Sequence, residues 1–172
     1  MSRLSIDSQL KRKYVPQLEE IDFATYGIMP SENYRKIASR FPDAYKLLRF
    51  GDKVLGYTLL LGLNKNCLDA LKQGKIGEEE ISVRDISQTY PEGVYIASIA
   101  SAPSMRNQKP FVSGTLVGSL TGRILDFRGE VIAMPVTRTG INLARMLSLE
   151  PTEIVSPTNQ SYELVPTIWR KK

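Results

Sequence analysis

The residues best suited to chemistry lie in one short loop that contains Arg106, Gln108 and Lys109. The loop follows Val94–Ala100, an uncharged run of β-branched, aromatic and small residues that predicts a buried strand. It precedes Pro110, which fits the first turn of a helix because proline has a suitable fixed φ and no needed N–H is lost there. A strand, a cationic loop and a helix start together favour phosphate binding, through main-chain N–H groups and the helix dipole. The sequence therefore predicts an anion site at this loop.

The helix predicted after the loop must pack on the sheet, because its apolar residues recur at every fourth position and form one face. These residues are Val112, Leu116, Leu120 and Ile124, with Val117 and Leu125 beside them. Glycines recur at the same interval, at Gly114, Gly118 and Gly122. We expect the glycines to allow close packing on the sheet, and Gly114 alone to have a second role, admitting a phosphate to the backbone.

Other elements are predicted on both sides of this centre, and no linker is long enough to divide the chain. Strands are expected at 4–6, 45–50, 54–62, 131–136, 153–155 and 162–165, and helices at 14–23, 31–40, 67–73 and 140–147. The chain of 172 residues is thus expected to be one α/β (α+β) domain over residues 1–172 with a full core.

Composition excludes several classes of function. The sequence has no histidine and one cysteine, Cys67, which excludes the usual zinc sites and every histidine-based triad, so no metal is expected. A single cysteine also fits a reducing compartment, and the N-terminus has no apolar signal core, so we expect a cytoplasmic protein without a membrane span. The acidic run Glu78–Glu80 is expected to be a solvated surface segment.

The net charge of +5 allows two interpretations, a mildly basic solvated surface or a site for an anionic ligand such as a nucleotide. Nucleic acid is not expected as a partner. The densest basic clusters, Lys11–Lys13 and Arg170–Lys172, are short and are not interleaved with aromatic residues.

Four stretches in this order resemble the GNAT N-acyltransferase superfamily. They are Gln17–Asp22 with the following Ser31–Pro42, then Gly51–Tyr57, Tyr95–Pro103 and Gly140–Pro151. The resemblance covers nearly the whole chain. It implies a mixed, mostly antiparallel sheet with a splayed central strand and helices on both faces. It also implies that acetyl-CoA or another acyl-CoA is the donor.

The resemblance implies a set of donor-binding residues. The family's pyrophosphate loop can be placed in two registers, on Lys109–Gly114 with Gly114 as its one matching glycine, or on Arg106–Lys109. Main-chain groups near Ile99 would pair with the pantetheine arm and hold the oxyanion. The implied donor-binding residues are Ile99, Ala100, Ser101, Arg106, Lys109, Val112, Ser113, Gly114, Thr115 and Asn142.

The acceptor side of the site is less defined. Without histidine, the general base must be a carboxylate or a tyrosine, unless the amine deprotonates by itself or passes its proton to a chain of waters. Tyr57 and Tyr95 are candidates on predicted strands, and Glu19, Glu20 and Asp22 are alternatives. The tyrosine that often serves as general acid in the family's late helix is absent here.

The function expected from the resemblance is acyl transfer, most simply of acetyl, to a small-molecule or peptide amine by direct attack in a ternary complex. Two alternatives stay open at this point. One is a GNAT-like binding or regulatory module without catalysis. The other is an acyl synthase that uses a long-chain acyl-CoA or an acyl carrier protein, whose acidic surface would suit a basic chain. A homodimer is also possible.

Overall fold

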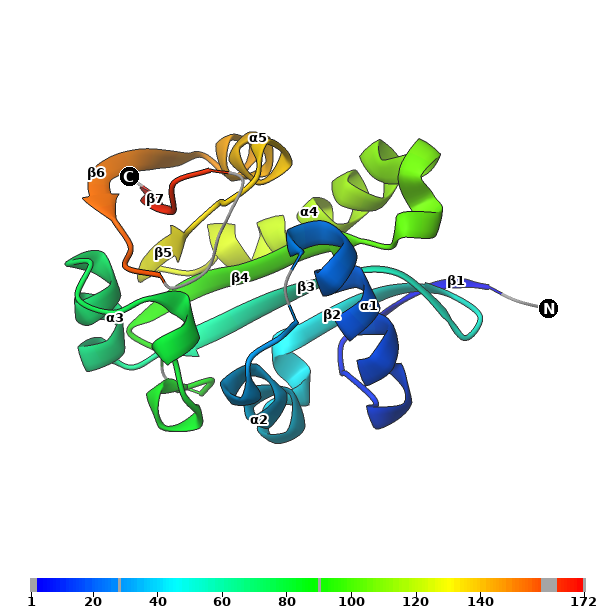
Figure 1. The fold of residues 1–172 in the computed structure, drawn as a ribbon, viewed down its shortest axis with the longest axis horizontal. Coiled ribbons are helices and arrows are strands. Elements are labelled where there is room, and N and C mark those ends of the chain that lie inside the picture. The colour runs from blue at the N-terminus through cyan, green and yellow to red at the C-terminus, as the bar shows by residue number, and fades with distance from the viewer. Residues whose placement is uncertain (1–2, 28, 90, 159–163, 172) are drawn as a thin grey trace. The chain divides into compact units, whose positions relative to one another are not determined.

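The computed structural model describes residues 3–27, 29–89, 91–158 and 164–171, and the side chains of Arg106 and Lys109 lie outside that description. Figure 1 shows the elements in chain order. The strands are β1 (Leu4–Asp7), β2 (Tyr45–Phe50), β3 (Lys53–Leu63), β4 (Gly93–Ser101), β5 (Glu130–Ala133), β6 (Leu149–Val155) and β7 (Thr167–Lys171). The α-helices are α1 (Val15–Tyr26), α2 (Glu32–Arg40), α3 (Lys65–Lys72), α4 (Lys109–Leu125) and α5 (Arg138–Met146). Short 3-10 helices are η1 (Arg12–Tyr14), η2 (Pro42–Ala44), η3 (Glu78–Glu80), η4 (Val83–Asp85) and η5 (Pro103–Gln108).

The seven strands form one sheet in the order β1-β2-β3-β4-β5-β7-β6. β1 and β2 pair antiparallel, as do β2 and β3, β5 and β7, and β6 and β7, whereas β4 and β5 pair parallel. This confirms the expected mixed, mostly antiparallel sheet.

The chain divides into two compact units. We call residues 1–59 and 98–122 the first unit, and residues 60–97 and 123–172 the second unit. Since β3 and β4 each contribute to both units, neither unit is a continuous segment of the chain. The prediction of a single domain over residues 1–172 stays a prediction.

Helices cover both sides of the sheet in the first unit. Neighbouring residues of a strand point to opposite faces, and on β3 Tyr57 hydrogen-bonds Asp22 of α1, while a Cβ added to Gly56 would lie 2.8 Å from Val112 of α4. α1 and α4 therefore lie on opposite faces. The core under α4 consists of Leu48, Leu55, Val112 and Leu116, with Ile99 and Met105 packed against it.

The close approach between α4 and the sheet is made by Gly56, not by the helix glycines. A Cβ at Gly56 would lie 2.7 Å from the carbonyl oxygen of Ala100. A Cβ at Gly114, Gly118 or Gly122 would meet no described group within 4 Å outside the helix's own neighbouring backbone. The prediction that the helix glycines pack on the sheet is wrong, because those three positions lie on the exposed side of α4.

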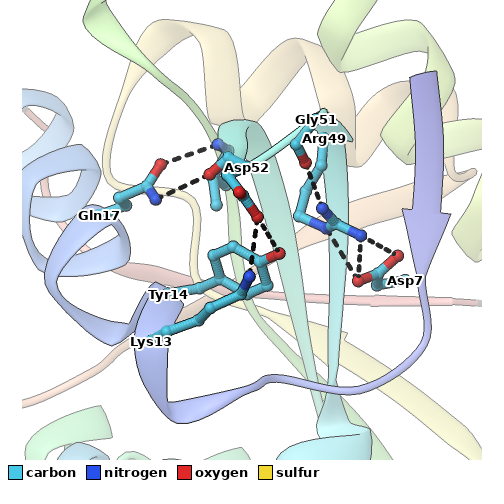
Figure 2. Close-up of polar contacts among 8 residues, drawn as sticks. Asp7, Lys13, Tyr14, Gln17, Arg49, Gly51 and Asp52 are labelled. Atoms are coloured by element: carbon cyan, nitrogen blue, oxygen red, sulfur yellow. Dashed lines mark hydrogen bonds and ion pairs between the residues drawn. The ribbon is translucent and has the colours of Figure 1, made fainter. Parts of the chain in front are cut away.

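A polar cluster fixes β1 and the β2–β3 turn to the start of α1, as Figure 2 shows. Arg49 donates from Nε and Nη2 to the two carboxylate oxygens of Asp7, both at 2.8 Å. The Gln17 amide receives the Val54 N–H at 2.8 Å and donates to the Asp52 carbonyl at 3.0 Å. Lys13 pairs with the Asp52 carboxylate at 2.7 Å. The first turn of α1 and the hairpin turn are thereby held as one piece.

The second unit holds the parallel pair β4–β5, the terminal strands and the segment between β3 and β4. Gly93 to Ile96 pair with Glu130 to Ala133. α3 is tied to β5 by Lys72, which lies 2.6 Å from a carboxylate oxygen of Glu130. Trp169 of β7 is buried.

Some sequence predictions fail at the ends of elements. The strand predicted at 162–165 is wrong for Leu164 and Val165, because the last strand is Thr167–Lys171; the remaining residues of that prediction lie outside the described part. Leu125, predicted beside the apolar face of α4, is 65% exposed because it is the last residue of the helix.

Within the described ranges, no helix combines the length and the apolar character that a membrane crossing requires.

Candidate functional site

The predicted anion site is built from the end of β4, η5 and the start of α4, all in the first unit. β4 pairs with β5 only as far as Ile96, but it continues to Ser101. The Ala102 N–H then donates to the Leu55 carbonyl at 2.8 Å, which fixes the end of the strand to β3. Ile99 to Ser101 therefore lie outside the β4–β5 ladder, and β4 is the expected splayed central strand.

The two registers predicted for the pyrophosphate loop lie differently relative to α4. α4 begins at Lys109 and η5 ends at Gln108, so Arg106 to Gln108 precede the helix and Gly114 lies in its second turn. Only the first N–H groups of a helix lack a partner within it. The donors predicted from Val112 to Thr115 are thus misplaced, because Ser113 and the residues after it lie inside the hydrogen-bonding pattern of the helix. The N–H groups without a partner inside α4 are those of Lys109 and Phe111, which directly follow η5.

Side chains near the helix start contribute less than predicted. Val112 is fully buried in the core, so only its main chain is available to a ligand. The Thr115 hydroxyl donates to the Phe111 carbonyl at 2.9 Å, which uses its hydrogen within the helix. Ser113 is half-buried. Among the described residues, positive φ occurs only at Ser148 and at Gly27, Gly51 and Gly74, so this helix start needs no left-handed residue.

Charge distinguishes this segment from the rest of the chain. Residues 98–122 contain two cations, Arg106 and Lys109, and no carboxylate. The first unit as a whole has 12 Lys and Arg against 7 Asp and Glu, a net charge of +5, whereas the second unit has 11 of each and is neutral. The entire net charge of the protein lies in the unit that contains the anion site.

A second polar group lies on the opposite face of the sheet, between α1 and the strands. The Tyr57 hydroxyl donates to the Asp22 carboxylate, and the hydroxyls of Tyr26 and Ser98 lie 3.0 Å apart. The rings of Tyr45 and Tyr57 are 6.0 Å apart between centroids. Asp22 and Tyr26 are one helical turn apart on α1, so they present the same face to the sheet. We call Asp22, Tyr26, Tyr45, Tyr57 and Ser98 the tyrosine cluster.

The residues of the tyrosine cluster differ in how deeply they are buried. Tyr45, Tyr57 and Ser98 are buried, whereas Asp22 and Tyr26 are half-buried. Burial, and then the charge of Asp22, raises the pKa of Tyr57 well above its ordinary value, and the same two causes raise the pKa of Tyr45. Both phenols are therefore protonated at neutral pH, and Tyr57 cannot act as a base there.

The other tyrosine candidate, Tyr95, lies in the second unit. It is 1% exposed, and its hydroxyl donates to Glu78 of η3. The prediction that Glu78–Glu80 is a solvated segment is wrong in this respect, since Glu78 ties η3 to β4 and Glu80 accepts the Gly77 N–H at 2.8 Å. The pair attaches the segment between β3 and β4 to the sheet.

Sequence reasoning missed two members of the tyrosine cluster, Tyr26 and Ser98. The helix was predicted only as far as residue 23, whereas α1 extends to Tyr26, so the sequence did not place Tyr26 one helical turn from Asp22. Ser98 gave no signal beyond its small size in a strand. Asn142 is exposed on α5 in the second unit, and its predicted contact with the donor arm stays a prediction.

The sheet order, the parallel β4–β5 pair, and β4 continuing through η5 into α4 define the fold of the GNAT acetyltransferases. The structure matches the loading GNATL domain of CurA from Lyngbya majuscula over 98% of this chain and 97% of that one, with 12% identity and a TM-score of 0.67. It matches Arabidopsis thaliana Naa50, solved with the bisubstrate analogue CoA-Ac-MVNAL, over 98% of both chains, with 14% identity and a TM-score of 0.66. It matches the ribosomal-protein-S18-alanine N-acetyltransferase of Escherichia coli over 98% and 93%, with 12% identity and a TM-score of 0.60.

These structural matches confirm the fold that the resemblance implied. No protein-family profile matches the sequence, and no curated protein does.

Proposed function

We propose that the first unit binds an acyl-CoA and that the protein transfers the acyl group, most simply acetyl, to an amine by direct attack in a ternary complex. The observation that carries the proposal is the segment from the end of β4 to the start of α4. It combines strand main chain that lies beyond the β4–β5 ladder, a helix start and two cations without a carboxylate. CoA or its analogues are bound in two similar structures, Naa50 and the diaminobutyrate acetyltransferase EctA from Paenibacillus lautus.

Each part of the donor has a matching group. The diphosphate suits the first turn of α4, because the helix dipole and N–H groups favour an anion and Arg106 and Lys109 add positive charge. The peptide-like pantetheine arm suits the main chain of Ile99 to Ser101, by strand addition. A main-chain N–H in this strand stabilises the oxyanion that forms on the thioester oxygen.

The transfer step needs only the two substrates. The neutral amine nitrogen attacks the thioester carbon, a C–N bond forms and the C–S bond breaks. The CoA thiolate leaves and takes up a proton, and the amine loses one. A covalent acyl-enzyme on cysteine is disfavoured, because Cys67 is buried and its burial, with the charge of Asp85, raises the pKa of the thiol to about 12.

Initial-rate kinetics test direct transfer. With acetyl-CoA and a primary amine both varied, double-reciprocal plots should intersect, as a ternary complex requires. Parallel lines would indicate an acyl-enzyme and contradict the proposal. Replacing acetyl-CoA with a series of longer acyl-CoAs, and with an acylated carrier protein, would show which donor the site prefers.

A binding module without turnover is the second candidate. It is favoured by the hydroxyls of Tyr57 and Tyr95, which are buried and donate to carboxylates, so that neither offers a solvent-exposed acid for the leaving thiolate. Binding of acetyl-CoA without transfer to any amine would select this function.

A further inference from the structure

We infer that the tyrosine cluster recognises the acceptor, and that the acceptor is an alkyl ammonium with no carboxylate beside its amine. This inference rests on the proposed acyl transfer and names the substrate class of that reaction. Asp22 supplies the negative charge that attracts the ammonium, and Tyr26 and Tyr57 position it. The ammonium releases its extra proton to water before the neutral amine attacks the thioester.

The charge around Asp22 favours binding of a cation there. Most aliphatic amines are protonated at neutral pH, so an acyltransferase must first bind a cation. The first unit carries a net charge of +5, which repels a cation from most of its surface. Asp22 provides a local negative charge, and its half-buried position makes an ion pair stronger than one in open water.

The surroundings of Asp22 are the second argument. A carboxylate has about four acceptor positions, so Tyr57 can donate to it while an ammonium donates to it as well. The rings of Tyr45 and Tyr57 lie 6.0 Å apart between centroids, and the charge of Asp22 raises the pKa of both phenols; aromatic faces attract cations. A carboxylate among aromatic rings is chemically suited to an ammonium and unsuited to an anion.

Position along β4 is the third argument. Ser98, which contacts Tyr26, is next to Ile99, where the proposed donor segment begins. The donor segment and the tyrosine cluster are thus joined through consecutive residues of one strand. An amine held by Asp22 is placed next to the strand that would hold the thioester.

The selectivity for amines without a neighbouring carboxylate follows from the sign of the charge. An acceptor such as glycine would bring its own carboxylate toward Asp22, and like charges in a partly buried site repel. Glycinamide, in which a neutral amide replaces the carboxylate, would avoid that repulsion. The inference therefore favours glycinamide, alkyl amines and polyamines over free α-amino acids.

The test is acetyl transfer by the full chain to glycinamide, glycine, butylamine and spermidine. Wild-type protein should prefer glycinamide to glycine by at least about ten-fold in kcat/KM, with each value calculated per unprotonated amine. Asp22→Asn should raise the KM for butylamine by about ten- to a hundred-fold while the KM for acetyl-CoA changes less than two-fold. Asp22→Glu, which keeps the charge, should recover part of the loss. Tyr57→Phe should raise the amine KM by a smaller factor of about two to ten.

The control is Glu32→Gln, which removes an exposed carboxylate paired with Lys36 on α2 of the same unit. It should leave both KM values unchanged. A purely structural role for Asp22 predicts another pattern: Asp22→Asn would lower the melting temperature and affect both KM values alike. That pattern would overturn the inference, as would an equal preference for glycine and glycinamide.

A second measurement does not require turnover. Butylamine, added in the presence of CoA, should raise the melting temperature of wild-type protein but not of Asp22→Asn. If the protein binds acetyl-CoA yet neither binds nor acetylates these amines, the inference is wrong although the donor site stands. If it binds no acyl-CoA, the proposed function is wrong. The inference then depends on whether butylamine raises the melting temperature of wild-type protein but not that of Asp22→Asn.

Discussion

Each unit contains a strand tyrosine that donates its hydroxyl to a carboxylate from a helix. In the first unit Tyr57 of β3 donates to Asp22 of α1, and in the second Tyr95 of β4 donates to Glu78 of η3. The two tyrosines are equally buried, at 2% and 1% exposed. What differs is the setting. Asp22 lies among further tyrosines in a unit of net charge +5, whereas Glu78 lies in a neutral unit and holds the segment between β3 and β4. We propose recognition for the pair in the first unit, whereas the pair in the second unit attaches η3 to β4.

The units also differ in what their glycines do. In the first unit Gly56 of β3 allows α4 to pack on the sheet, while Gly118 is exposed on the helix. In the second unit Gly62, on the same strand, would place a Cβ 2.7 Å from the Ser87 carbonyl oxygen. Glycine on β3 therefore leaves room for a helix in the first unit and for an irregular segment in the second.

The largest stability effect is expected at Gly56. Gly56→Ala should lower the free energy of unfolding by about 3 kcal/mol, because the new Cβ meets a backbone oxygen and two core side chains that cannot all move away. Gly118→Ala is the matched control. It should raise the free energy of unfolding by roughly 0.5–1 kcal/mol, since its Cβ meets open space and alanine favours helix. Chemical denaturation of both variants checks this, and an equal response would show that α4 does not pack at Gly56.

The next effect compares the two tyrosines directly. Tyr57→Phe and Tyr95→Phe should each lower the free energy of unfolding by about 2 kcal/mol, because each leaves a carboxylate without its phenol donor. Only Tyr57→Phe should change the KM for an amine. A change in amine KM on Tyr95→Phe that matches the change on Tyr57→Phe would remove the distinction between the units.

The sequence predicted the elements around the donor segment well because their signals are local. An uncharged strand, a cationic loop, Pro110 and a four-residue apolar repeat determine β4, η5 and the buried face of α4 without long-range information. Where a helix begins is less local. The sequence predicted a helix from Pro110 onward but not its first residue, which the structure places at Lys109.

The tyrosine cluster was only partly predictable, because it joins residues that are far apart in the sequence. Tyr57 and Asp22 were separate candidates, but nothing in the sequence pairs residues 35 positions apart. The prediction that the helix glycines pack on the sheet was wrong for a related reason. A four-residue repeat shows that the glycines share one side of the helix, but not whether that side faces the sheet or solvent.

The smallest of these effects concerns the polar cluster at β1. Asp7→Asn should lower the free energy of unfolding at neutral pH by about 1 kcal/mol, since one of two charge-assisted hydrogen bonds from Arg49 is lost. Hydrogen bonds from Arg49 lower the pKa of the Asp7 carboxyl, so its stabilisation is complete above the unfolded-state pKa and disappears as the pH falls through the folded-state value. The difference between wild type and Asp7→Asn should therefore be constant near neutrality and shrink below about pH 4. Urea titrations across this range check it, and a difference that grows on acidification would contradict it.

The most direct test of the account is the affinity of the chain for acetyl-CoA, measured by isothermal titration. The wild type should bind, and the double variant Arg106→Ala with Lys109→Ala should bind about ten- to a hundred-fold more weakly. Its matched control, Lys11→Ala with Arg12→Ala, removes two exposed cations from the same unit and should bind within about two-fold of wild type at moderate salt. Raising the salt should weaken wild-type binding more than binding by the first double variant. No binding of acetyl-CoA by the wild type, or equal binding by the two double variants, would show that the start of α4 is not the donor site.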